Sequence, residues 1–120
     1  MGLLAGPAGA EGGVPSGQPL VLWQVLWERV EGHGTQAVLR FIAPGIAPGG
    51  SVGIDAAQAD MDWLCETHGV PISALGYARS DTVVLDLMDR PVPRGETDRE
   101  ATRYVSVYSI DEDTCVPETF

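Results

Sequence analysis

The sequence contains no lysine, only two histidines and two cysteines, and no long apolar run. Its seven basic residues are all arginine and stand against 17 acidic ones, so the formal net charge is −10. Nucleic acids and anionic membrane surfaces are bound through clusters of basic side chains, so this balance argues against both kinds of partner. No stretch approaches the ~20 apolar residues of a transmembrane helix, and we therefore expect no membrane span.

Patterns that mark catalytic or metal centres are also missing. The two histidines, His33 and His68, form no HxH or HExxH pair, and there is no GxSxG or phosphate-binding loop. The acidic turn at residues 111–113 lacks the alternating oxygen ligands of a calcium loop. We therefore predict no catalytic centre, no metal and no cofactor. The alternative is a small hydrolase or metal-dependent enzyme, in which His33 or His68 would have to meet an acidic side chain in space.

The N-terminal residues resemble the end of a secretory signal. Ala8-Gly9-Ala10 is a small-x-small site after an apolar stretch, and cleavage there would leave Glu11 as the first residue. No basic residue precedes Arg29, so either the signal starts upstream of Met1 or the segment is a flexible cytoplasmic tail. We expect a periplasmic or secreted protein, and otherwise a cytoplasmic one.

The length fits one domain. We predict a signal-peptide remnant and flexible linker over residues 1–19, rich in glycine and proline, and a single domain over residues 20–120. Turn residues divide that domain into a helix and four strands. The strands are expected at residues 20–30, 35–43, 82–88 and 102–110, and the helix at residues 55–69, capped by Asp55 and ended by Gly69.

This order predicts an α+β fold. It is a two-layer ββαββ arrangement, in which an antiparallel sheet carries one helix packed on one face. Alternation along the second strand places Ala37, Leu39 and Phe41 on one face and Arg40 on the other. The acidic residues of the helix, Asp60 among them, are interpreted as its exposed side.

The two cysteines are expected to pair. Cys65 falls on the apolar side of the predicted helix and Cys115 just after the last strand. Two cysteines in an exported chain are typical of a structural disulfide, and closing a loop of this length stabilises a domain by about 4 kcal/mol. In a reducing compartment Cys65 would instead be a small buried apolar residue.

Trp23 and Trp27 are the candidate binding surface. They are an even number of residues apart, so in a regular strand both point the same way. Leu22 and Leu26 make the opposite side apolar as well, which is typical of a strand that is covered on both sides or left for a partner. We predict a binding or accessory domain that contacts a protein of the cell envelope. The alternative is a small-molecule pocket between helix and sheet.

Several packing and turn motifs resemble a small uncharacterised family of alphaproteobacterial proteins of the Rhodobacter and Roseobacter type. They are Val14-Pro15-Ser16-Gly17-Gln18-Pro19, Arg40-Phe41-Ile42-Ala43-Pro44, Asp60-Met61 through Leu64-Cys65, Asp89-Arg90-Pro91-Val92-Pro93 and Thr114-Cys115 through Phe120. The resemblance implies an exported protein with no established activity. Some sequences of that family carry the label acetolactate synthase. Thiamine-diphosphate catalysis needs a large subunit with a cofactor cleft and a magnesium site, so we interpret that label as transferred.

Overall fold

The computed structural model describes residues 13–32, 34–75 and 80–118. Its sheet has five strands in the spatial order β1-β2-β3-β4-β5: β1 (Val21–Val30), β2 (Gly34–Ile42), β3 (Thr82–Met88), β4 (Arg103–Asp111) and β5 (Thr114–Pro117). A 3-10 turn (Pro44–Ile46) leads to α1 (Ile54–Leu64), which continues through a π-helical turn (Cys65–Gly69) into α2 (Val70–Ser73). The expected class, an α+β fold with a sheet and one helical segment, is confirmed.

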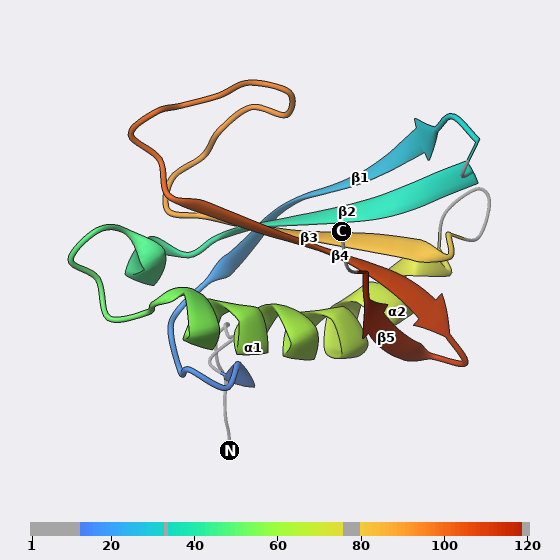
Figure 1. Ribbon diagram of the computed structural model, residues 1–120, viewed down its shortest axis with the longest axis horizontal. Helices are drawn as coiled ribbons and strands as arrows, with labels where there is room; N and C mark the ends of the chain where they lie inside the picture. The colour runs from blue at the N-terminus through green and yellow to red at the C-terminus, as the bar shows by residue number, and fades with distance from the viewer. Residues whose placement is uncertain (1–12, 33, 76–79, 119–120) are drawn as a thin grey trace, which may run out of the picture.

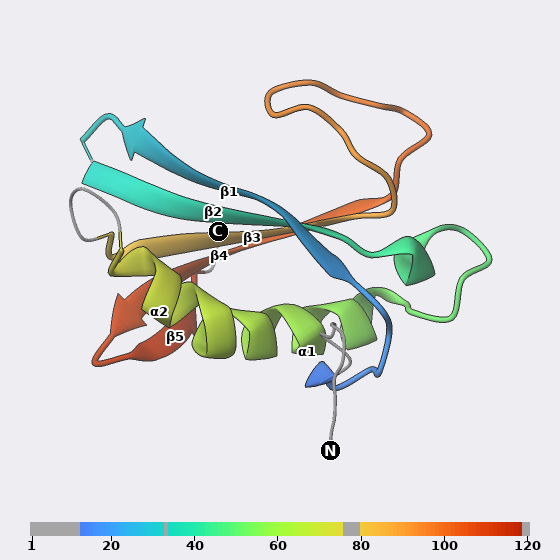
Figure 2. The ribbon, with the colours of Figure 1, turned by 180° about the vertical axis from the view of Figure 1, so that it is seen from behind.

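The sheet separates two unlike layers. Figure 1 and the view from behind in Figure 2 place α1 and α2 along one face of the sheet, and the loop of residues 89–102 beyond the other face. We call these the helix face and the loop face. Ala37, Leu39 and Phe41 of β2 are fully buried on the helix face, as their alternation predicted. Val38 and Arg40 point to the loop face.

One strand pair differs from the expected antiparallel sheet. β2 and β3 run parallel, from Gln36 opposite Thr82 to Ile42 opposite Met88, whereas the three other pairs are antiparallel. The helical segment connects these two strands, and a helix that returns along the sheet brings the next strand in parallel to the last. The sheet is therefore mixed. The predicted ββαββ order is also incomplete, because a fifth strand follows.

The fifth strand was not predicted. β4 turns back into β5 at Glu112 and Asp113, which both have positive φ angles, of 51° and 66°. Two consecutive positive φ angles are typical of the tight hairpin turn whose twist matches that of the strands. Asp tolerates this backbone, but Glu at the first position is unusual there and the turn contains neither Asn nor Gly, so the sequence carried no clear hairpin signal.

The helix is longer than predicted. Gly69 does not end it, because the backbone there is right-handed (φ −67°) and the chain continues to Ser73. A β carbon at Gly69 would lie 3.0 Å from Cγ1 of Val83. The glycine thus serves the close approach of the helix to β3. At the other end Gly53, not Asp55, is the N-cap, and Asp55 lies in the first turn, where its charge favours the helix dipole.

Candidate functional site

The two tryptophans lie on β1, at one edge of the sheet. Trp23 is 36% exposed and Trp27 40%. The prediction that both point the same way is wrong, because the pairing of β1 with β2 is irregular between Leu22 and Gln24. A bulge adds one residue and reverses the alternation that follows it. Trp23 lies over the guanidinium of Arg40 on the loop face, with 5.1 Å between the guanidinium carbon and the ring centroid.

Trp27 belongs to the helix face. It lies opposite the buried Ala37 of β2, and Val25, two residues earlier on the same face, packs against the core. Val21 and Leu22, at the start of the strand, are also exposed. β1 therefore carries exposed apolar side chains on both of its faces.

The two edges of the sheet are built differently. β5 has only four residues and ends at Pro117, which has no N–H to extend a ladder of hydrogen bonds. β1 has ten residues and pairs regularly with β2 from Gln24 to Val30. A short edge with a proline is protected against pairing with another chain. β1 contains a bulge at Trp23, but its stretch from Gln24 to Val30 is longer and regular and contains no proline. The candidate surface thus lies on the edge that is more open to an added strand.

A buried ion pair lies on the loop face. Arg40 donates from Nε to Oδ2 of Asp86 at 3.0 Å, and both side chains are fully buried. The Arg40 guanidinium also donates to Oε1 of Gln24 at 2.6 Å and to the backbone oxygen of Val92. Val92 belongs to the loop of residues 89–102, so the loop closes over the pair and satisfies its donors. A buried charge with this many partners is held in one position.

Two further arginines approach the same carboxylate. Arg103 donates to both oxygens of Asp86 at 2.9 Å, and Nη1 of Arg94 lies 3.9 Å from its Oδ2. Arg94 also forms two hydrogen bonds with Glu28 of β1, of 2.7 and 2.8 Å. These bonds from Arg94 are the main reason why the pKa of Glu28 is lowered, against the opposing effect of burial. Glu28 thus fastens the loop to the edge strand.

Sequence reasoning missed this cluster. Arg40 is far along the chain from Arg94 and Arg103, and the sequence analysis did not predict that these side chains meet. A signal was present, because Arg40 stands between Leu39 and Phe41, and Asp86 between Leu85 and Leu87. A single charge inside a buried apolar strand requires a partner of opposite sign.

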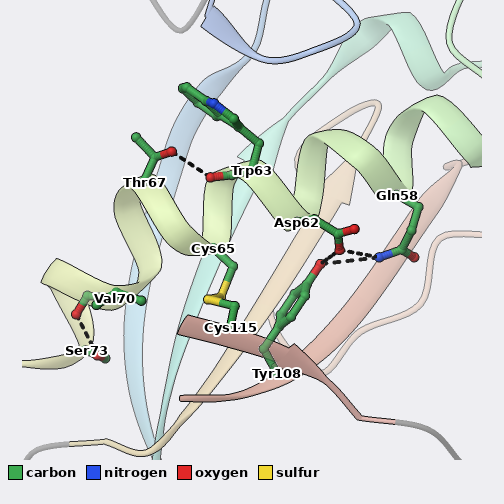
Figure 3. Close-up of a disulfide and its surroundings, with 9 residues drawn as sticks. All are labelled: Gln58, Asp62, Trp63, Cys65, Thr67, Val70, Ser73, Tyr108 and Cys115. Atoms are coloured by element: carbon green, nitrogen blue, oxygen red, sulfur yellow. Dashed lines mark hydrogen bonds between the residues drawn. A yellow bond between two sulfur atoms is a disulfide. The ribbon is translucent and has the colours of Figure 1, made fainter. Parts of the chain in front are cut away.

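A polar network joins α1 to β4 on the helix face (Figure 3). The Tyr108 hydroxyl donates to Oδ1 of Asp62 at 2.7 Å, and Gln58 donates to the same carboxylate at 3.0 Å. Ser106 donates to Oε1 of Gln58 at 3.1 Å. Burial, and then the hydrogen bond to Asp62, raise the pKa of the Tyr108 hydroxyl. A tyrosine held this firmly in its neutral form serves as a hydrogen-bond donor that fixes the helix on the sheet.

Asp60 corrects another expectation. It was interpreted as part of the exposed side of the helix, and it is fully buried. Its carboxylate accepts hydrogen bonds from the backbone N–H and the hydroxyl of Ser16, at 2.9 and 2.6 Å, and from the side-chain amide of Gln18 at 2.7 Å. The described part of the predicted linker, from residue 13 onward, is therefore attached to α1, and Val14 is buried with the core.

The predicted disulfide is present. Cys65 and Cys115 are bonded, with an S–S distance of 1.98 Å and 6.2 Å between the Cα atoms (Figure 3). The bond joins the start of the π-helical turn to β5. Structural disulfides persist in oxidising compartments, with which this bond is consistent.

Apolar side chains pack between the helix and the sheet. The layer contains buried apolar residues from α1, β2 and β3, namely Met61, Leu64, Leu39, Phe41, Leu85 and Leu87.

His68 lies edge-on to Trp63, with 6.0 Å between the ring centroids. His33 lies outside the described residues, as does the predicted cleavage site.

With this geometry established, comparison with known proteins gives one match. The model of a protein family described as a family of unknown function (DUF6497) matches residues 2–120. The chain belongs to the DUF6497 family. No curated protein and no solved structure matches it.

The described part of this DUF6497 member holds no group of three or more histidine, cysteine or acidic side chains placed to bind a metal ion. Within the same residues, no helix is long and apolar enough to cross a membrane.

Proposed function

We propose that this chain is a protein-binding accessory domain and that β1 is its contact surface. The observation that carries the proposal is the set of exposed apolar side chains on this one edge strand: Val21, Leu22, Trp23 and Trp27. Clustered exposed apolar side chains mark interaction sites, and tryptophan contributes more binding energy at interfaces than most residues. An edge strand also offers unpaired backbone groups to an added strand.

The arrangement of the rest of the molecule supports this role for β1. On the loop face, β1 is fixed by two contacts: the hydrogen bonds between Arg94 and Glu28, and the stacking of Trp23 on Arg40. A strand held in this way loses little conformational entropy on binding, which favours affinity. No reaction is assigned to the chain.

We further propose that the protein works in the periplasm or outside the cell, after cleavage before Glu11. The disulfide and the Ala8-Gly9-Ala10 site support this compartment. N-terminal sequencing of the protein isolated from its native source tests it, and Glu11 is the expected first residue. Cytoplasmic protein with free thiols at Cys65 and Cys115 would contradict the proposal.

The binding proposal is tested by affinity capture from the envelope fraction with Trp27→Glu. This substitution puts a charge on the contact surface at a partly exposed position, and Leu75→Glu is its matched control. Leu75 is 76% exposed, lies after α2 and is not part of β1. We expect wild type and Leu75→Glu to retain the same proteins, and Trp27→Glu to lose them.

Each variant is first shown to unfold at the same denaturant concentration as wild type, so that loss of capture reports the surface. His33→Ala and His68→Ala are expected to leave capture unchanged. If Trp27→Glu captures the same proteins as wild type, β1 is not the contact surface.

A further inference from the structure

The sequence of β1 is complementary to itself in antiparallel pairing. We propose that two copies of this chain associate through β1, related by a twofold axis at Leu26, so that their two sheets become one. The inference rests on the proposed function, because it takes β1 as the contact surface and names a second copy as the partner.

The geometry of a sheet limits the ways in which β1 can meet itself. When two antiparallel strands are related by a twofold axis perpendicular to the sheet, each residue lies opposite a residue of the other copy on the same face of the sheet. With the axis at Leu26, this residue faces its own equivalent. Val25 then faces Trp27 of the second copy, and Gln24 faces Glu28 of the second copy. All five residues lie in the part of β1 that pairs regularly with β2.

On the helix face this register pairs apolar side chains. Val25 is half-buried and packs against the core of its own copy, and Trp27 is 40% exposed beside it. Aromatic and β-branched residues directly opposite each other are among the favourable pairs across antiparallel strands. The twofold axis forms this contact twice, and it covers the exposed part of both Trp27 rings.

On the loop face the same register completes a hydrogen bond. Gln24 accepts from Arg40 through Oε1, and within the described residues its Nε2 donates to nothing. The side chain opposite it is Glu28 of the second copy. Glu28 is held in place by Arg94 and Gln36. An amide donor that meets a carboxylate forms a charge-assisted hydrogen bond, which again occurs twice.

Neighbouring registers lose this match. An axis at Trp27 would set Leu26 against Glu28 and Val25 against Arg29, which places charged side chains opposite apolar ones. An axis at Val25 would set Gln24 against Leu26 and would bring Trp27 against the bulge. The other edge of the sheet is no substitute, because β5 is short and ends in Pro117. Complementarity therefore selects Leu26 as the centre.

The register is tested by single cysteine substitutions in the full chain, oxidised with copper phenanthroline while Cys65 and Cys115 stay paired. Directly opposed β carbons lie about 4.5–5.5 Å apart, close enough for a disulfide to form with small adjustment. Leu26→Cys is expected to give a covalent dimer by itself. Val25→Cys and Trp27→Cys are expected to cross-link when mixed with each other, and not when oxidised separately.

Sedimentation equilibrium tests association without any cross-link. We expect wild type and Leu75→Glu to show a concentration-dependent monomer–dimer equilibrium, and Trp27→Glu to remain monomeric. Each copy carries a formal charge of −10, so added salt, which screens repulsion between the copies, should favour the dimer.

The outcomes separate this inference from the proposed function. Wild type that sediments as a monomer at every concentration overturns the second copy as partner. In that case loss of capture of another protein by Trp27→Glu leaves β1 as the contact surface. A dimer in which Val25→Cys or Trp27→Cys cross-links with itself, and Leu26→Cys does not, overturns the Leu26 axis. If Trp27→Glu changes neither capture nor sedimentation, both proposals fail.

Discussion

The Nε atom of Arg40 donates a hydrogen bond of 3.0 Å to Oδ2 of Asp86, and neither side chain is exposed to solvent. The pair lies between β2 and β3, at residues that are direct neighbours in the parallel register. It is the central charge pair of the loop face, since Arg94 and Arg103 both lie within 4 Å of the same carboxylate. The stability of this face should depend on Asp86 more than on any of its arginine partners.

We predict that Asp86→Asn destabilises the protein by about 3–5 kcal/mol, because it leaves the buried Arg40 charge uncompensated. Urea unfolding measures the loss. Glu28→Gln breaks a partly exposed pair and serves as the control, with an expected cost of about 1 kcal/mol or less. Replacing the pair together, by Arg40→Met with Asp86→Leu, should recover much of the stability. An Asp86→Asn protein that unfolds at the wild-type urea concentration would contradict this account.

The disulfide gives the second prediction. It joins residues 50 positions apart, so removing both cysteines with Cys65→Ala and Cys115→Ala should cost about 4 kcal/mol through the greater entropy of the unfolded chain. Wild type in the presence of a reductant should unfold at the same urea concentration as the double variant. Equal stability of oxidised and reduced wild type would show that the bond does not constrain the unfolded chain.

The third prediction concerns the loop of residues 89–102. The pKa of Glu28 is lowered in the folded protein, mainly by hydrogen bonds from Arg94, so its contribution to stability is present above the unfolded pKa of about 4.3 and is lost as the pH falls further. Amide hydrogen exchange in the loop should therefore accelerate in Arg94→Ala at neutral pH. Arg90→Ala, in the same loop, is the control, because among the described residues Arg90 pairs with Asp89 and Glu100 of the loop itself and not with β1.

In wild type, lowering the pH below about 4.3 should also accelerate amide exchange in the loop. The exchange rates are first corrected for the intrinsic dependence of amide exchange on pH. Loop exchange that is the same in Arg94→Ala and in wild type would mean that the Glu28 hydrogen bonds do not hold the loop.

The fourth prediction concerns Tyr108. Burial and the hydrogen bond to Asp62 raise the pKa of its hydroxyl, so the stability that it contributes is complete below the unfolded pKa of about 10 and decreases as the pH rises above it. Tyr108→Phe should cost about 1 kcal/mol at neutral pH and reduce the loss of stability in alkali. Tyr104→Phe, on the same strand, is the control and should leave the stability at neutral pH unchanged. Titration of tyrosinate absorbance in each variant identifies the hydroxyl that ionises last.

Local patterns in the sequence predicted most of the elements. Thr82–Met88 is an apolar run bounded by polar residues, and β3 has these bounds. Cys65, which the sequence placed on the apolar side of the helix, is fully buried. These features depend on residues that are close together in the chain, so a single sequence contains the necessary information.

Features that depend on distant residues were not predicted. The bulge in β1 reverses the direction of Trp23 relative to Trp27, and it becomes visible only in the pairing of β1 with β2. Asp60 is buried because Ser16 and Gln18 satisfy it from a segment that seemed to be a linker by composition. The side-chain contacts of Asp86 come from three different parts of the chain, at Arg40, Arg94 and Arg103. Each of these sites becomes visible only when the tertiary partners are known.

The disulfide closes a covalent ring that contains β3, the loop of residues 89–102 and β4. A protease that cuts the loop after Arg94 or Arg99 therefore opens the ring without releasing a fragment. The two halves stay joined by sulfur, and β3 and β4 remain paired through their backbone hydrogen bonds. Outside a reducing environment the domain should thus survive a cut in this exposed loop as a nicked but complete molecule.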